Sequence, residues 1–160
     1  MTEKRFVGLD LAFANNGVLI LDKKGNNIIY QEVLSTSKKD LDEVRLVNIR
    51  TKLNSLLQNN DIVCLEGLSF GSQGMALAQL GATHYIIRVL LHERNIDFSV
   101  VSPSTLKKFV TGKGNCKKDL MLLKVFQKWG VEFSNDNLAD AYSLARFALD
   151  SYQKSSGETN

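Results

Sequence analysis

The chain has 160 residues, of which 44% are hydrophobic and 23% charged, the composition of one soluble globular domain rather than of a disordered or fibrous protein. Its 20 basic and 17 acidic residues leave a net charge of only +3, so charge alone does not demand a nucleic-acid partner. Two cysteines without a CxxC pair exclude a disulfide framework, and the lack of a secretory signal or a membrane-length apolar run predicts a cytoplasmic protein.

The first third of the chain is predicted to form an antiparallel meander. Its segments are short and mostly apolar, and a turn around Gly25 separates the second from the third. The three predicted strands are Arg5–Leu11, Gly17–Asp22 and Asn27–Leu34.

Helices and strands are predicted to alternate after the meander. The apolar spacing changes to the helical period over Leu41–Asn60, and the short apolar segment Asp61–Glu66 is typical of a buried parallel strand. The elements predicted next are a helix over Ser72–Arg94, a strand over Phe98–Val101, and helices over Lys117–Trp129 and Asp136–Tyr152. We expect the buried face of the first of these helices to comprise Met75, Ala78, Ala82, Tyr85, Ile86 and Val89.

This order of elements predicts an α/β fold. The sheet is expected to be mixed, with three antiparallel strands followed by two parallel strands, and to be flanked by helices. The sequence contains no internal repeat and no low-complexity linker, so residues 1–152 are expected to form a single domain. The polar segment 153–160 is expected to be a flexible tail.

Three acidic residues stand where buried apolar side chains are expected. Asp10 interrupts the first strand, Glu66 ends a parallel strand, and Asp140 lies close to the apolar face of the last helix. Burying one carboxylate is costly, and mutual repulsion raises that cost when three converge on one place. A bound divalent cation removes both costs, and a ligand set made only of oxygen atoms favours Mg²⁺ or Mn²⁺ over zinc.

Each of these acids also has a structural explanation when it is taken alone. Asp10 could cap the loop that follows it, Glu66 could pair with a buried cation, and Asp140 could face water near a helix N-terminus. All three together favour a two-metal site for phosphodiester hydrolysis, in which one ion activates water and the other stabilises the leaving oxygen.

The fourth metal ligand is open between two neighbouring residues. Asp136 and Asn137 precede Asp140 by four and three residues, so either can share its helix face. Asp136 offers a negative charge and Asn137 a neutral carbonyl oxygen. Alternatively, Asp136 or Asn135 could serve only to cap the helix.

Four stretches of the chain are informative through their order and spacing. They are VGLDLA, VCLEG, VVSPSTLKKFVTGKGNCKK and NLADAYSLA. Together they resemble the RuvC-type Holliday-junction resolvases of the RNase H-like superfamily, over nearly the whole chain. The resemblance implies an RNase H-like fold and a homodimeric, Mg²⁺-dependent endonuclease that nicks Holliday junctions and other branched DNA, such as forks and flaps. It further implies that Asp10, Glu66 and Asp140 bind the metal ions, which we expect to number two.

Two positions depart from the pattern of that family. The family usually carries an acid three residues before its last aspartate, where this chain has Asn137. Either Asp136 takes over there, or Asn137 ligates weakly, or the site is altered. The family also carries an aromatic residue after the second acid that is thought to wedge into the junction, and Phe70 stands one residue out of register.

Basic residues are concentrated between Leu106 and Lys118, where there is no acid and where Gly112 and Gly114 let the backbone approach a phosphate. A solvated loop explains this segment in isolation, whereas beside the acids it predicts a DNA-binding surface. The resemblance implies that Lys107 and Lys118 contact the scissile strand, and we assign Lys118 to neutralising the pentacovalent phosphate. The candidate DNA-binding residues are Lys107, Lys108, Lys113, Lys117, Lys118 and Phe70.

The long middle helix contains small residues, Ala78, Gly81 and Ala82, that permit close approach of another helix. Packing against the sheet explains them, and so does a homodimer interface, for which the family uses the corresponding helix. His84 and His92 of this helix have no third ligand at metal-binding spacing and are expected at the surface or in an interface.

Two other functions are compatible with the sequence. A plain RNase H acting on RNA–DNA hybrids shares the expected fold and metals, although the basic GKGNCKK loop and the long middle helix speak against it. The second is a degenerate nuclease that binds branched DNA without cutting it, because Asn137 could disarm the site.

Overall fold

The computed structural model describes residues 3–68, 71 and 73–157, and a five-stranded sheet lies at its centre. The strand order is β3–β2–β1–β4–β5, in which β1, β2 and β3 pair antiparallel while β4 pairs parallel with both β1 and β5. The predicted mixed sheet of three antiparallel and two parallel strands is thus confirmed. The strands are β1 (Phe6–Asp10), β2 (Asn15–Leu21), β3 (Ile28–Ser35), β4 (Ile62–Glu66) and β5 (Asp97–Val101).

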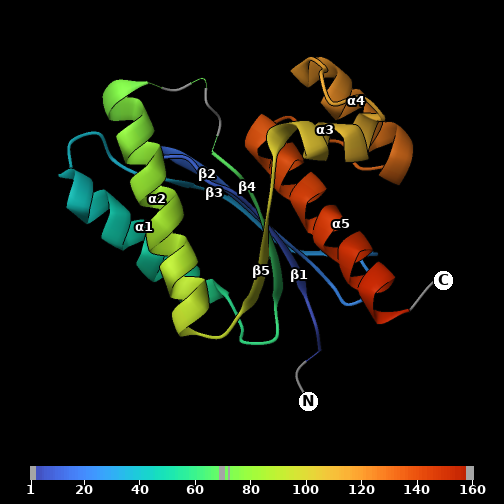
Figure 1. Cartoon of the computed structure of the whole chain (residues 1–160), viewed down its shortest axis with the longest axis horizontal. Helices are drawn as coiled ribbons and strands as arrows, with labels where there is room; N and C mark the ends of the chain where they lie inside the picture. Colours follow the sequence, from blue (N-terminus) through green and yellow to red (C-terminus); the bar gives the residue numbers. More distant parts are fainter. Residues whose placement is uncertain (1–2, 69–70, 72, 158–160) are drawn as a thin grey trace.

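Helices cover both faces of the sheet (Figure 1). One face carries α1 (Asp42–Leu56) and α2 (Gly74–Glu93), and the other carries α3 (Pro103–Thr111), α4 (Lys118–Trp129) and α5 (Asp136–Ser156). Successive side chains of β1 point to opposite faces of the sheet. Val7 and Leu9 join the core under α1 and α2, while Phe6 joins the core under α5. Asp10 therefore shares the α5 face of the sheet.

Two glycines let α5 lie directly on the sheet. A Cβ atom on Gly8 would overlap the backbone carbonyl oxygen of Ala141, and a Cβ atom on Gly17 would overlap that of Asn137. Any side chain at either strand position would push the helix away from the sheet. Because Gly17 is the cross-strand partner of Asp10, this contact fixes the start of α5 beside the end of β1.

The helix α3 was not predicted, because the segment was taken for a basic loop. The side-chain oxygen of Ser102 accepts a hydrogen bond from the backbone N–H of Thr105 at 3.1 Å and caps the helix. Pro103 occupies the first turn, where its missing N–H costs nothing, and Gly112 ends the helix with a φ of 82°. The basic segment is therefore a nine-residue helix followed by a short loop.

The last helix continues into the segment that was predicted to be a flexible tail. α5 extends to Ser156, so the residues from Gln153 onward are helical as far as that position. The aromatic ring of Tyr152 lies 5.6 Å from that of Phe6, measured between centroids, which ties this end of the helix to β1. The tail was predicted from its polar composition alone, which contains no information about the contact between Tyr152 and Phe6.

The face of α2 that packs on the sheet differs from the predicted one. Met75, Tyr85 and Val89 were expected to be buried but are 71%, 56% and 50% exposed. The prediction was wrong because apolar residues occur on nearly all sides of this helix, so their spacing does not identify the packed face. The residues of α2 that are buried are Thr83, His84, Ile87, Leu90 and Leu91.

His84 accordingly lies inside the domain and not at the surface, while His92 is exposed as expected. Burial, followed by the charge of Arg88, lowers the pKa of His84, so its imidazole is neutral in the core. Within the described residues, α2 is also the one helix long and apolar enough to cross a membrane, with a mean hydropathy of 1.2 over 18 residues. One of its faces packs on the core of this domain, and the other leaves large apolar side chains exposed.

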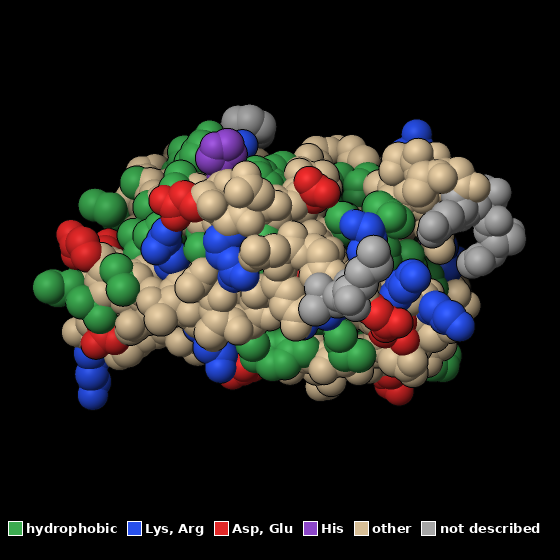
Figure 2. Space-filling view, turned by 90° about the horizontal axis from the view of Figure 1, so that it is seen from below, with side chains coloured by type: hydrophobic (Ala, Val, Ile, Leu, Met, Phe, Trp, Pro, Cys, Tyr) green, Lys and Arg blue, Asp and Glu red, His purple; other side chains and the backbone are tan. Residues whose placement is uncertain are grey.

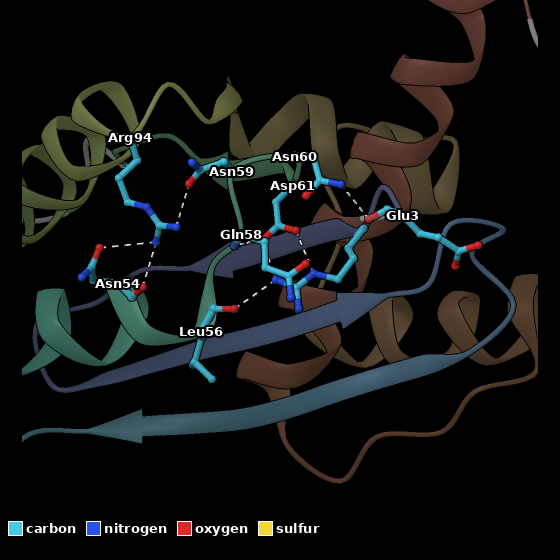
Figure 3. A network of polar contacts seen from close by, with 9 residues as sticks. Glu3, Asn54, Leu56, Gln58, Asn59, Asn60, Asp61 and Arg94 are labelled. Atoms are coloured by element: carbon cyan, nitrogen blue, oxygen red, sulfur yellow. Dashed lines mark hydrogen bonds and ion pairs between the residues drawn. The ribbon is translucent and has the colours of Figure 1, made fainter. Parts of the chain in front are cut away.

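The end of the molecule where β1 begins has mixed charges. Figure 2 views this end from below Figure 1 and shows Lys and Arg side chains interspersed with Asp and Glu and separated by neutral surface. Beneath it, Arg5 donates hydrogen bonds to both carboxylate oxygens of Asp61 at 2.8 and 2.7 Å and to the carbonyl oxygen of Leu56 at 3.0 Å. The backbone N–H of Gln58 donates to the same carboxylate at 2.8 Å (Figure 3). Asp61 is only 1% exposed, and its charge and its hydrogen bonds are satisfied within the protein.

Candidate active site

The candidate site lies where β1 and β4 end and α5 begins. The parallel pairing of β1 with β4 runs as far as Leu9 opposite Leu65, so the next residues, Asp10 and Glu66, end the two strands side by side. Neighbouring strands are about 4.8 Å apart, and both acids face the layer formed by α5. That helix brings Asp140 over them from its second turn.

The three acids are half-buried and act on one another. Burial, with the charges of Asp140 and Glu66, raises the pKa of Asp10 to about 8, against an opposing effect of Lys118. Burial, with the charge of Asp140, raises the pKa of Glu66 to about 7, and burial also raises the pKa of Asp140. Three carboxyl groups coupled in this way cannot all be ionised at neutral pH without a compensating positive charge.

None of the described side chains or backbone groups forms a hydrogen bond or a close ion pair with these three carboxylates. Every fully buried side-chain nitrogen or oxygen in the described ranges has a partner, so the oxygens of the three acids must reach solvent. Among the described residues, no three His, Cys, Asp or Glu side chains form a preassembled metal-binding group. An open set of oxygen donors fits Mg²⁺, which retains several waters and takes few protein carboxylates.

Two of the predicted lysines lie within electrostatic reach of the acids. The charge of Lys118, in the first turn of α4, lowers the pKa values of Asp10, Glu66 and Asp140, and the charge of Lys107 on α3 lowers those of Glu66 and Asp140. The Lys118 side chain is 75% exposed, so its ammonium group is free to meet a phosphate. Both lysines thus lie near the acids, and their contacts with DNA stay a prediction.

The other candidate DNA-binding residues are less closely tied to the acids. Lys108, Lys113 and Lys117 are exposed on α3 and on the loop that leads into α4, and none of them perturbs the three acids. They extend a basic surface away from the site. Phe70, the candidate wedge, lies outside the described residues.

Asp136 lies at the rim of the site. Its carboxylate is 3.5 Å from the ammonium of Lys118, and its side chain is 46% exposed. Its charge raises the pKa of Asp140 but does not act appreciably on Asp10 or Glu66. A small pocket at this rim is lined by Lys118, Met121, Leu122, Asp136, Ala139 and Asp140.

Asn135, and not Asp136, caps α5. Its side-chain oxygen accepts hydrogen bonds from the backbone N–H groups of Asn137 at 2.9 Å and Leu138 at 3.3 Å. The backbone of Asn137 also lies against Gly17, on the inner side of the site. Of the two cap candidates, Asn135 therefore takes the capping role, and Asp136 is free of it.

The loop after Asp10 is held by residues that the sequence analysis did not single out. The side chain of Asn16, which is fully buried, accepts a hydrogen bond from the backbone N–H of Ala12 at 3.0 Å. The guanidinium of Arg45 lies 3.8 Å from the ring centroid of Phe13 and donates to its carbonyl oxygen. Asp10 is therefore not needed as a loop cap, and its carboxylate is left for the site. A polar residue entering the apolar run NGVLIL was the available signal for Asn16.

Comparison with known proteins gives consistent results. Residues 6–146 match the family described as crossover junction endodeoxyribonuclease RuvC. A protein of that name from Petrotoga mobilis is 32% identical over 145 residues, which cover 87% of this chain and 89% of the relative. Another from Rickettsia conorii is 27% identical over 149 residues, covering 89% and 95%. The structure of Thermus thermophilus RuvC in complex with a Holliday junction substrate matches with a TM-score of 0.80, 21% identity and 96% coverage of both chains, a likeness of fold.

Proposed function

The chain belongs to the RuvC family of crossover junction endodeoxyribonucleases, and we propose that it nicks Holliday junctions and other branched DNA in recombination and repair. Nucleases of this family depend on metal ions. The observation that carries the proposal is the group of three half-buried carboxylates at the ends of β1 and β4 and the start of α5. Raised pKa values and a lack of hydrogen-bond or ion-pair partners within the chain are properties expected of carboxylates that bind a cation.

We assign Asp10, Glu66 and Asp140 to holding two Mg²⁺ ions, for which Mn²⁺ can substitute. When bound, such ions lower the pKa of a water nucleophile and stabilise the leaving oxygen. The contribution of the chain is positional, since two strand ends and one helix bring the three carboxylates within electrostatic reach of one another. The cytoplasm, where chromosomal or phage DNA is processed, is the compartment in which this activity is needed.

Lys118 and Asp136 act together at the rim. The exposed ammonium of Lys118 can exchange the Asp136 carboxylate for a phosphate oxygen, which places positive charge beside the phosphorus as negative charge develops there. Asp136 then serves to orient Lys118, and Asn137, on the inner side, is the better candidate for the fourth ligand. Lys107, with Lys108, Lys113 and Lys117, extends the positive surface along the DNA backbone.

The exposed face of α2 is the proposed homodimer interface. Its large apolar side chains, Met75, Tyr85 and Val89, are at least half exposed, and Leu77 is 37% exposed. Gly81 has nothing within 4 Å of where its Cβ would be, so a second helix has room to approach there. A dimer presents two sites, as symmetric nicking of a four-way junction requires. Sedimentation of Tyr85→Glu against the parent chain tests this interface, with loss of the dimer as the expected result.

The decisive experiment is a nicking assay on end-labelled four-way, three-way, flap and linear DNA, with Mg²⁺, with Mn²⁺ and with EDTA. We expect metal-dependent nicks on the branched substrates and symmetric nicks on the four-way junction. An RNA–DNA hybrid belongs in the same series, because preferential cleavage of the hybrid would replace this proposal with an RNase H activity. Binding of branched DNA without nicking would instead indicate a disarmed binding module.

A further inference from the structure

A second group of cationic and aromatic side chains lies away from the acids, between the C-terminal end of α4 and the middle of α5. It surrounds a surface pocket of about 170 Å³ that is open to solvent. The pocket is lined by Phe109, Lys128, Trp129, Arg146, Leu149, Asp150 and Gln153.

Two positive charges in this pocket lack an acidic partner. Among the described residues, neither Lys128 nor Arg146 has a carboxylate within ion-pair distance. The acid that lines the pocket, Asp150, is paired at 2.7 Å with Lys154, which offsets its charge. The pocket therefore keeps a net positive lining.

Aromatic rings hold both cations in place. The ammonium of Lys128 lies 4.8 Å from the ring centroid of Trp129 and 4.4 Å from that of Phe109, and it donates one hydrogen bond to the Phe109 carbonyl at 2.8 Å. The guanidinium carbon of Arg146 lies 5.6 Å from the Trp129 centroid, and its Nε donates to the Tyr142 hydroxyl at 2.8 Å. Each cation retains N–H groups that these bonds do not use.

We propose that this cation–aromatic pocket binds a nucleotide through its phosphate, which would lie between Lys128 and Arg146 and beside Trp129. A guanidinium held by an aromatic ring is preorganised for two-pronged contact with a phosphate. The two cations without an acidic partner match a phosphate-bearing ligand better than an apolar one.

The pocket is separate from the candidate active site. Arg146 stands six residues after Asp140, about 9 Å farther along α5 and on a different side of that helix. The nucleotide can come from free solution or from a DNA arm that bends around α4. The proposal does not rest on the nuclease activity, so the Asp10→Asn variant should bind at this pocket as the parent chain does.

Trp129 is the single tryptophan of the chain, so its fluorescence reports on this pocket directly. The full-length protein in EDTA would be titrated with thymidine 5′-monophosphate, with thymidine, and with a short DNA duplex. We expect a saturable change in emission with the monophosphate or the duplex and none with thymidine. A response to the monophosphate assigns the pocket to free nucleotides as well, whereas a response to the duplex alone assigns it to a DNA arm.

Lys128→Gln and Arg146→Gln should each weaken that response by about tenfold in Kd, the range for a lost charge-assisted hydrogen bond. Lys124→Gln, on the same helix but outside the pocket, is the matched control and should leave Kd unchanged. Should Arg146→Gln prove unstable through loss of its Tyr142 bond, Lys128→Gln alone decides. The proposal is overturned by an equal response to thymidine, by no saturable response to either phosphate ligand, or by unchanged affinity in Lys128→Gln.

Discussion

The two ends of the sheet both enclose acidic side chains, yet the protein treats them in opposite ways. At the end where β1 begins, Asp61 is 1% exposed and receives hydrogen bonds from a guanidinium and a backbone amide. At the end where β1 finishes, Asp10, Glu66 and Asp140 face one another with no such bonds among the described residues. The difference separates an acid whose charge the fold balances from acids whose charge the fold leaves unbalanced, as the proposed metal ligands would be.

This contrast has a physical basis in the cost of enclosing charge. An enclosed carboxylate with a two-pronged arginine partner is neutralised by the chain itself, and removing the partner is what destabilises the fold. Half-buried carboxylates that face each other raise their own pKa values and store unfavourable electrostatic energy in the folded state. Only the second arrangement can release that energy when a divalent cation binds.

The largest effect is expected from Asp10→Asn at the unsatisfied end. Loss of a direct metal ligand should slow nicking by more than about 100-fold, since even residues that only support a ligand cost 10- to 100-fold. Junction binding should be kept or become tighter, because a negative charge beside the phosphate is removed. Single-turnover nicking and gel-shift assays measure the two properties. Nicking at the parent rate would show that the site has been placed wrongly.

Asp61→Asn should produce the opposite pattern at the satisfied end. It leaves Arg5 enclosed without its counter-charge, so the free energy of unfolding should fall by about 3–5 kcal/mol. Denaturant unfolding measures this loss, and the nicking rate of the folded protein should not change. If the fully folded variant nicked more slowly than the parent chain, the proposal that Asp61 contributes only to stability would be wrong.

The dependence of stability on pH should also distinguish the two ends. The pKa of Asp10 is 3.8 in the unfolded chain and about 8 in the folded protein, so the folded state retains a proton that the unfolded state releases. The contribution of this proton to the free energy of unfolding is complete below pH 3.8 and is lost as pH rises through about 8. In EDTA, Tm should therefore fall over this interval, and Mg²⁺ should raise Tm most at its alkaline end. Asp10→Asn should flatten the curve, whereas an unchanged curve in that variant would contradict the assignment.

Lys118→Gln tests the positive charge at the rim. Nicking should slow on the order of 10- to 100-fold, because the group that neutralises the developing phosphate charge is lost. The matched control is Lys124→Gln on the same helix, which should nick at the parent rate. Equal rates for the two variants would remove Lys118 from the mechanism.

The smallest effects are expected at the fourth ligand position. Asn137→Asp should lower the Mg²⁺ concentration needed for half-maximal nicking by about tenfold, because a charged donor replaces a neutral one. Asp136→Asn should leave that concentration unchanged and slow nicking only modestly, through the orientation of Lys118. Metal titrations of the two variants decide which residue ligates, and a large rise in the Mg²⁺ requirement of Asp136→Asn would reverse the assignment.

Much of the fold could be predicted because its signals are local. The short apolar runs and the order of strands and helices predicted the mixed sheet. Acids inside apolar runs indicated Asp10 and Glu66, which lie at adjacent strand ends. The packed face of α2 could not be predicted, because a helix that is apolar on most sides carries little directional signal. The sequence contained the capping residue of α3, Ser102, and the glycine that ends it, Gly112. The helix was nevertheless not predicted, because its many lysines were taken as a sign of a loop.

Other features depend on tertiary contacts that no local pattern contains. That Gly8 and Gly17 touch the backbone of α5 follows only from the packed structure. Asn135 and Asp136 are adjacent residues of equal capping preference, and the choice between them is made by how the chain enters α5. The roles of the three acids as ligands, and the number of ions, remain predictions.

The contact between α5 and the two glycines also bears on how this protein tolerates sequence change. Where a helix rests on side chains, its height above the sheet shifts whenever one of those side chains changes size. Here, main chain rests on main chain, so the spacing between Asp10 and Asp140 depends less on the volume of the surrounding core residues. Changes in the size of core leucines and valines should therefore move the acids less than a side chain at Gly8 or Gly17, which would force α5 off the sheet.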